Sequence, residues 1–150
     1  MRVSFDLDDT LILRNEPVPG LEPRNRFVAA ILFADERLRL GTRRLHRQLK
    51  AKGHEFWIYT SSLRSPGLIR RSFLVHGIWV DGIVNDDLHR QALQRTRTKG
   101  HPCKFPPAFG IDLHVDDSPG VAELGLNMGF HVVQVDPSDE SWVQQVLARV

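Results

Sequence analysis

The sequence predicts an α/β protein: a mostly parallel five-stranded sheet with helices on both faces, in a three-layer, Rossmann-like fold. Five short apolar segments alternate with segments whose apolar residues recur at helical spacing, which is the pattern of strands joined by crossover helices. The 150 residues suit one domain, and 41% hydrophobic with 25% charged residues is typical of a folded soluble protein. No internal repeat interrupts the pattern.

The first expected strand is an apolar, β-prone segment at the start of the chain that ends in three carboxylates. A strand places residues two apart on one face, so Asp6 and Asp8 are expected to point the same way while Leu7 enters the core. Asp9 has the wrong parity for that face and is expected to bond to the backbone of the turn. The prolines and glycine of residues 14–20 predict a loop or small flap.

Two helices are expected next. Over residues 23–35, apolar residues recur at helical spacing. Over residues 42–52, Leu45 and Leu49 form an apolar i,i+4 pair, and Thr42 is the expected N-cap. The basic residues of the second helix are interpreted as a solvated surface: Arg43, Arg44, Arg47, Lys50 and Lys52.

The middle of the chain repeats a strand–loop–helix rhythm. Residues 55–59 form the second expected strand, which breaks at Thr60. A helix is expected to begin at Ser65, because serine is a good N-cap and proline follows at the first helical position. A short strand over residues 80–84 and a polar helix over 86–97 are expected to follow, before a loop over residues 98–107.

The last part of the chain again alternates strands and helices. The fourth strand ends in two acids, Asp116 and Asp117, and a Ser-Pro pair then opens a helix as before. The strands and helices expected here cover residues 111–115, 118–128, 130–135 and 142–150.

Charge and cysteine content exclude several classes of protein. Twenty Lys and Arg against 18 Asp and Glu give a net charge of +2, which is too balanced to favour nucleic-acid binding. A single cysteine, Cys103, allows no internal disulfide, and the histidines show no metal-ligand spacing. With no signal peptide and no apolar segment of membrane-spanning length, a cytoplasmic protein without membrane contact is expected.

Three expected strands deliver polar groups to one edge of the sheet, where ligands bind in such folds. The carboxylates at this edge would repel one another unless a cation lies among them, and Mg²⁺ prefers oxygen ligands. Together with a hydroxyl and a lysine, they supply the groups that phosphoryl transfer needs: Asp6, Asp8, Asp116, Asp117, Thr60 and Lys104.

These residues resemble the motifs of the haloacid dehalogenase-like superfamily of hydrolases, in its phosphatase-type form. Asp6-Leu7-Asp8-Asp9-Thr10 resembles the first motif, D-x-D-x-T. Thr60 stands in the place of the second motif, Lys104 in that of the third, and Val115-Asp116-Asp117-Ser118 in that of the fourth. The four occur in the family's order over residues 3–121.

The resemblance implies a role for each residue. Asp6 would be the nucleophile that forms an aspartyl-phosphate, and Asp8 would protonate the leaving oxygen and then activate water. Mg²⁺ would be held by the Asp6 carboxylate, the main-chain carbonyl of Asp8 and an acid of the fourth motif. Thr60 and Lys104 would bind phosphoryl oxygens, and the presence of Asp8 points to phosphate esters rather than carbon–halogen bonds.

Several assignments stay open. The fourth motif departs from the commoner pattern, because Asp116 fills a glycine place and Val121 stands where a second acid often falls. Asp117 is the preferred metal ligand, with Asp116 as an indirect or water-mediated partner. Lys104 is preferred over Lys99, which lies in the same loop.

Two further residues are candidates for anion contact. Ser61 follows the second strand, so its backbone N–H is a candidate phosphate donor, although solvation of the loop explains it equally well. Arg64 lies near a helix start and is a candidate contact for phosphate or another substrate anion.

The room for a substrate-covering cap is small. Residues 1–150 are expected to form a single catalytic domain with a small flap or insert at about 11–40, which leaves the site open. The leading hypothesis is a Mg²⁺-dependent phosphatase. The alternatives are a non-catalytic phosphate-recognising regulatory module and a phosphotransferase. The expected partner is a phosphorylated small molecule or macromolecule, with nucleic acid only as a substrate; the oligomeric state stays open.

Overall fold

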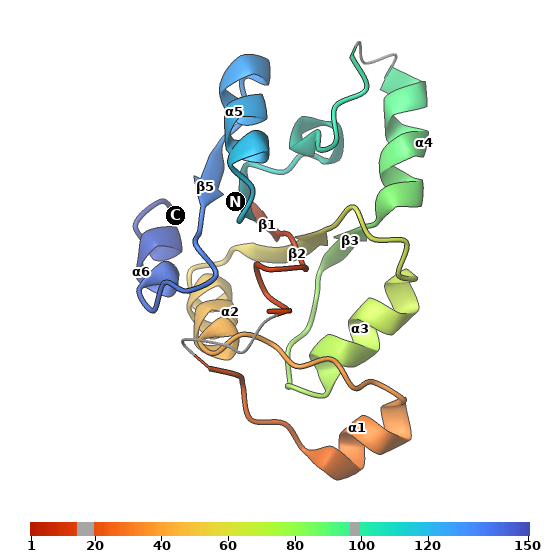
Figure 1. Cartoon of the computed structure of the whole chain (residues 1–150), viewed down its shortest axis with the longest axis vertical. Helices are drawn as coiled ribbons and strands as arrows, with labels where there is room; N and C mark the ends of the chain where they lie inside the picture. The colour runs from red at the N-terminus through yellow and green to blue at the C-terminus, as the bar shows by residue number, and fades with distance from the viewer. Residues whose placement is uncertain (15–19, 97–99) are drawn as a thin grey trace.

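The computed structural model describes residues 1–14, 20–96 and 100–150. Its five strands form one sheet, every neighbouring pair is parallel, and the strand order is β3-β2-β1-β4-β5 (Figure 1). The strands are β1 (Arg2–Phe5), β2 (Glu55–Tyr59), β3 (Gly82–Val84), β4 (Leu113–Asp116) and β5 (Val132–Gln134). The helices are α1 (Arg26–Leu32), α2 (Thr42–Ala51), α3 (Pro66–Leu74), α4 (Asp86–Thr96), the 3-10 helix η1 (Pro106–Phe109), α5 (Pro119–Met128) and α6 (Trp142–Leu147).

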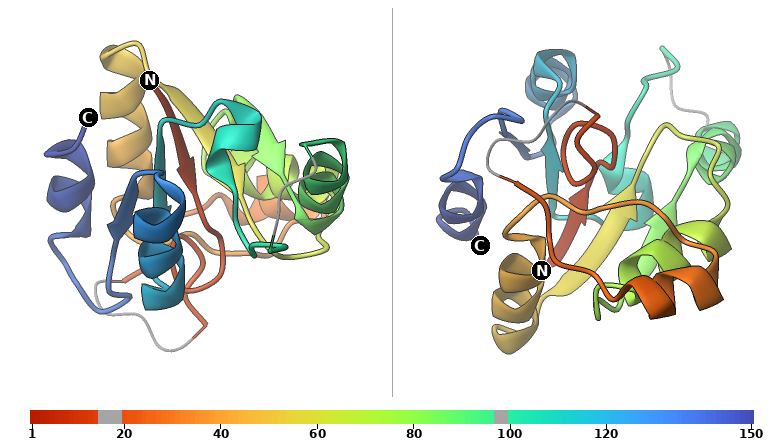
Figure 2. Two further views of the ribbon diagram at one scale, coloured as in Figure 1. Left: turned by 90° about the horizontal axis from the view of Figure 1, so that it is seen from above. Right: turned by 60° about the horizontal axis from the view of Figure 1, so that its bottom comes forward.

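Helices cover both faces of the sheet, so the predicted α/β architecture is confirmed. In Figure 1, α4, α5 and η1 lie above the sheet, and α2 and α3 lie below it. Helix α6 lies beside α2, and α1 lies beside α3 on the outside of the molecule (Figure 2). The parallel strands bring all their carboxyl ends to the same edge, which is where ligands bind in folds of this class.

The core is built around the central strand β1. Val3 and Phe5 are fully buried, and the Phe5 ring stacks on Phe56 of β2 with 4.6 Å between ring centroids. The predicted pair Leu45 and Leu49 on α2 is also fully buried against this cluster. Each such side chain contributes about 1.5–3 kcal/mol of hydrophobic stabilisation, which fixes β1 and the residues that follow it.

Several predicted boundaries were too wide. The helix expected over 23–35 spans only Arg26–Leu32, because Asn25 caps its start and Phe33 ends it in a left-handed conformation with φ 49°. The strands expected over 80–84 and 130–135 are Gly82–Val84 and Val132–Gln134, and the last helix ends at Leu147 rather than 150. The strand expected over 111–115 is shifted along the chain to Leu113–Asp116. The expected loop over residues 98–107 contains the start of η1.

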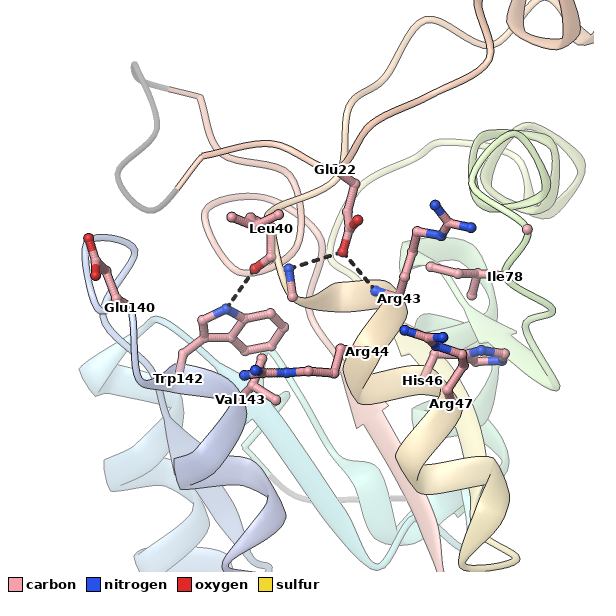
Figure 3. Close-up of a pocket in the computed structure, with 12 residues that line it drawn as sticks. Glu22, Leu40, Arg43, Arg44, His46, Arg47, Ile78, Glu140, Trp142 and Val143 are labelled. Carbon is pink, nitrogen blue, oxygen red and sulfur yellow. Dashed lines mark hydrogen bonds between the residues drawn. The ribbon is translucent and has the colours of Figure 1, made fainter.

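The N-cap assignment of Thr42 was wrong. Thr42 is the first helical residue of α2, and its hydroxyl donates to the carbonyl of Arg39. The cap position belongs to Gly41, whose φ of 97° favours glycine. The carboxylate of Glu22 takes over the capping role, because its Oε1 accepts from the backbone N–H groups of Gly41 and Arg43, each at 3.0 Å (Figure 3).

Replacing Glu22 by Ala is expected to lower the free energy of unfolding by about 1–2 kcal/mol, because two N–H groups at the start of α2 lose their acceptor. Urea unfolding followed by circular dichroism measures this change. Glu140 is a matched control, since it is an exposed acid that lines, with Glu22, the cavity drawn in Figure 3. A Glu22→Ala variant no less stable than Glu140→Ala would contradict the capping role.

The described residues 20–40 of the insert predicted near residues 11–40 run along the lower side of the molecule in Figure 1. A bridge joins Leu21 to Arg39 on either side of α1, and Ala29 of α1 packs against Val75. Most of the predicted flap, residues 15–19, lies outside the described residues. Within the described ranges, no helix is long and apolar enough to span a membrane.

Candidate active site

A cavity of about 760 Å³ lies at the ends of β1, β2 and β4. The residues predicted for the site line it together: Asp6, Asp8, Thr60, Ser61, Lys104, Asp116 and Asp117. They meet because parallel strands end at one edge of the sheet. The alternative lysine, Lys99, lies outside the described residues.

Three carboxylates form the centre of the cavity. One oxygen from each of Asp6, Asp116 and Asp117 lies within 4.8 Å of the others. Burial raises the pKa of Asp6 to about 6, although the charge of Lys104 acts in the opposite direction. Burial, together with the neighbouring Asp116, also raises the pKa of Asp117. The cluster is therefore a site where a cation would relieve desolvation and repulsion at once.

Lys104 places a cation beside this cluster. Its side chain is 3% exposed, and Nζ donates to Asp6 Oδ1 at 2.6 Å and to the carbonyl of Tyr59 at 2.5 Å. Asp116 Oδ2 lies 3.9 Å from the same Nζ. A lysine so placed neutralises part of the charge on Asp6 and faces the oxygens of an anion bound there.

The loop that carries Lys104 is anchored by a buried hydrogen-bond chain. The Tyr59 hydroxyl accepts from the backbone N–H of Phe105 at 2.7 Å and bonds to His89 Nδ1 at 2.6 Å. The other nitrogen of His89 bonds to the carbonyl of Pro102 at 2.9 Å. His89 of α4 and Tyr59 of β2 thus hold the loop on both sides of Lys104.

The Asp116 carboxylate is engaged by the protein on both oxygens. Oδ1 accepts from the backbone N–H of Ser118 at 2.9 Å, and Oδ2 accepts from His114 Nε2 at 3.0 Å. Burial lowers the pKa of His114, so the ring is neutral, and its Nδ1 accepts from the Ser4 hydroxyl at 2.8 Å. Burial disfavours a charged Asp116, yet the hydrogen bonds from His114 and Ser118 and the positive charge of Lys104 outweigh it, so the pKa of Asp116 is lowered.

Asp117 is less constrained. In the described part of the chain, the only side chain that donates a hydrogen bond to its carboxylate is Thr10, with 3.2 Å between Oγ1 and Oδ1. Asp117 therefore keeps more oxygen lone pairs for a ligand than Asp116 does. This difference supports the sequence-based preference for Asp117 as the direct metal ligand.

Asp8 lies outside the carboxylate cluster and pairs with Arg64. The Arg64 guanidinium donates to Asp8 with two bonds, Nη1 to Oδ2 at 3.0 Å and Nη2 to Oδ1 at 3.1 Å. Its Nε donates to Glu36 Oε1 at 2.7 Å. The hydrogen bond to Asp8 raises the pKa of Arg64, so the guanidinium stays charged. Arg64, a candidate anion contact from the sequence, thus holds the predicted acid/base residue.

The remaining predicted residues shape the loops around the cavity. Thr60 is buried, and its hydroxyl accepts from the backbone N–H of Ser62 at 3.0 Å, while Ser61 is exposed at the rim. Asp9 adopts φ 60° and accepts from the backbone N–H of Arg14 at 3.2 Å, so its predicted role in the turn is confirmed.

Sequence reasoning missed His114 and Glu36. A signal existed for His114, because it lies two residues before Asp116 on a strand and therefore shares its face. Glu36 carries no such signal. It lies 28 residues before Arg64 in a segment without regular structure, and only the three-dimensional fold brings the two together.

Solved structures with a similar fold were found by comparison. CbbY from Rhodobacter sphaeroides, solved as a mutant in complex with xylulose-(1,5)bisphosphate, matches with a TM-score of 0.53 and 14% identity, over 90% of this chain and 85% of CbbY. A predicted HAD-like family hydrolase from Porphyromonas gingivalis matches with a TM-score of 0.52 and 14% identity, over 99% of this chain and 96% of the other. No family model and no curated protein sequence matches the chain.

Proposed function

We propose that this chain, which has the fold of the haloacid dehalogenase-like hydrolases, is a Mg²⁺-dependent phosphatase that forms an aspartyl-phosphate on Asp6. The observation that carries the proposal is the environment of Asp6: a carboxylate at the end of the central strand, paired with a buried lysine and adjacent to two further acids. The bisphosphate bound by CbbY, a fold neighbour, agrees with phosphate-ester chemistry.

The donor set fits a hard divalent cation. Asp6, Asp116 and Asp117 each offer one carboxylate oxygen, the kind of ligand that Mg²⁺ prefers, within 4.8 Å of the others, and a bound cation would offset the burial that raises the pKa values of Asp6 and Asp117. Asp6, Asp117 and the main-chain carbonyl of Asp8 would hold the ion, with Asp116 behind them. When bound, Mg²⁺ supplies positive charge that offsets the charges of the phosphate and of Asp6.

The chain's own residues supply the remaining chemistry. An Asp6 oxygen attacks phosphorus, and the ester oxygen leaves with a proton from Asp8. Asp8 then takes a proton from water, the resulting hydroxide attacks the phosphorus of the acyl-phosphate, and inorganic phosphate departs with Asp6 restored. Lys104 and Thr60 bind the phosphoryl oxygens as charge develops.

The other two candidates are a phosphate-binding module and a phosphotransferase. The presence of Asp8 favours an enzyme over a binding module, because binding needs no acid/base residue. The proposed partner is a phosphorylated small molecule or macromolecule that enters an open site.

Hydrolysis of an aryl phosphate tests the proposed function. Purified protein is expected to release the phenol with Mg²⁺ and to stop when a chelator is added, and activity is expected to return with excess Mg²⁺. Turnover that continues unchanged in chelator would contradict the metal-dependent mechanism.

The two neighbouring acids are expected to differ in their effect on Mg²⁺. Asp117→Ala removes a proposed ligand, so the Mg²⁺ concentration for half-maximal activity is expected to rise by about 100-fold or more, whereas loss of the indirect partner in Asp116→Ala costs about 10-fold. Metal titrations of the two variants measure the difference. A larger shift for Asp116→Ala would exchange the two assignments.

A further inference from the structure

We propose that Arg64 is a substrate-phosphate binding residue that exchanges partners: it holds Asp8 in the free protein, and an entering phosphate monoester takes over the same N–H groups and releases Asp8. The inference rests on the proposed function and assigns a residue that no motif of the resemblance contains. It also links two events that are otherwise separate, the arrival of the phosphate and the release of the acid/base residue.

The first step of the argument is the geometry of the pair. Two terminal nitrogens of Arg64 donate in parallel to the two oxygens of Asp8, at 3.0 and 3.1 Å. This is the fork that a guanidinium forms equally with carboxylate and with phosphate. The Asp8 carboxylate therefore occupies the two N–H groups of Arg64 that could instead bind two oxygens of a phosphoryl group.

The second step is that Glu36 and Ser62 hold the Arg64 guanidinium independently of Asp8. Nε of Arg64 donates to Glu36 at 2.7 Å, and Nη1 also donates to the Ser62 hydroxyl at 3.0 Å. Ser62 in turn donates its backbone N–H to Thr60, a predicted phosphate contact. With Glu36 and Ser62 in place, the guanidinium keeps its orientation when Asp8 leaves, and little ordering is required when an anion binds.

The third step is that the Asp8 pair is incompatible with the proposed role of Asp8. In the ion pair both Asp8 oxygens face the guanidinium, and a carboxylate held in an ion pair carries no proton that it could give to a leaving group. The side chains of Arg64 and Asp8 are 25% and 20% exposed, so solvent weakens their attraction. A doubly charged phosphate ester can therefore displace Asp8, and the released carboxylate takes up a proton from solvent before it protonates the leaving oxygen.

Among the described residues, the second arginine that lines the cavity does not share these features. Arg14 approaches Asp8 at 3.6 Å and Asp9 at 3.9 Å, and its side chain is 67% exposed. Its contacts are longer and its guanidinium is less restrained than that of Arg64. The arrangement thus favours Arg64 as the residue that receives the phosphate.

Calorimetric titration with inorganic phosphate in Mg²⁺ buffer tests the exchange without requiring turnover. The Kd is expected to rise by about 10- to 100-fold in Arg64→Gln, the usual effect of losing charge-assisted hydrogen bonds. Arg64→Lys keeps the positive charge but cannot form two parallel hydrogen bonds, so its Kd for phosphate is expected to lie between those of the unmodified protein and Arg64→Gln. Glu36→Gln is expected to raise the Kd less than Arg64→Gln does. Arg71→Gln on the exposed side of α3 is the matched control, with an unchanged Kd.

The outcomes separate the inference from the proposed function. Phosphate binding that depends on Arg64 in a protein without esterase activity would support the inference and contradict the phosphatase. If turnover depends on Asp6 but Arg64→Gln leaves the Kd for phosphate and the KM unchanged, the inference is overturned and the proposed function stands. No phosphate binding by the unmodified protein would also overturn it. Circular dichroism checks each fold, and the charge-retaining Arg64→Lys variant decides the question if Arg64→Gln does not fold.

Discussion

The Asp6→Asn variant is expected to lose aryl phosphatase turnover by roughly 10⁴-fold or more, the scale seen when a single nucleophile is removed. The amide cannot form the acyl-phosphate, but it has nearly the same shape as the carboxylate. Because burial already raises the pKa of Asp6 to about 6, replacing a partly desolvated charge by a neutral group leaves the fold intact. Steady-state kinetics and thermal unfolding measure the two effects.

Asp9→Asn provides the matched control for this variant. Asp9 lies in the same acidic segment, and its left-handed conformation suits asparagine as well as aspartate. The turnover of Asp9→Asn is expected to stay within a few-fold of the turnover of the unmodified protein. Equal activity of Asp6→Asn and Asp9→Asn would remove Asp6 as the nucleophile.

The Lys104→Met variant is expected to lower kcat by about 10²- to 10³-fold, because a preset donor to the developing charge is removed. Methionine fills a similar volume without a charge. The loss of Lys104 also removes the cation that opposes the effect of burial on Asp6, so the pKa of Asp6 is expected to rise above about 6. Activity in the variant should therefore require a higher pH, since more of Asp6 is protonated near neutrality.

Lys99→Met tests which of the two lysines, Lys99 or Lys104, takes the place of the third-motif lysine. If Lys104 is the third-motif residue, Lys99→Met is expected to retain kcat. Loss of kcat in Lys99→Met together with normal activity in Lys104→Met would reverse the assignment. Fold checks accompany both variants, because Lys104 is buried and its removal leaves Asp6 without its partner.

The strands and their order along the chain could be predicted because a parallel sheet needs apolar strands between helices. Their ends could not, because apolar residues also fill the core outside the strands. Val80 and Ile111 are 2% and 6% exposed and belong to no strand. Helix α1 shows a further limit: Phe27 and Ile31 gave it helical periodicity, yet they are 74% and 57% exposed.

The acids and the hydroxyl of the candidate site followed from the parallel topology, which brings the ends of the strands to one edge of the sheet. The strand parity expected for Asp6 and Asp8 does not apply, because β1 ends at Phe5 and Asp8 lies outside the carboxylate cluster, although both residues line the cavity.

The contacts that orient the site residues depend on distances between remote segments. Glu22 replaces Thr42 in capping α2, and Glu36 holds Arg64, and neither partner lies at a spacing that secondary structure makes regular. Such pairs become visible only in the folded chain.

Direct detection of a phosphoryl group on Asp6 tests the central claim. The protein is mixed with an aryl phosphate and Mg²⁺, quenched in acid during turnover, and treated with borohydride, which reduces an acyl-phosphate to an alcohol. Peptide mass spectrometry is expected to find homoserine at position 6 and unmodified Asp8. Turnover with unmodified Asp6, or with the label on another residue, would contradict an aspartyl-phosphate mechanism at this site.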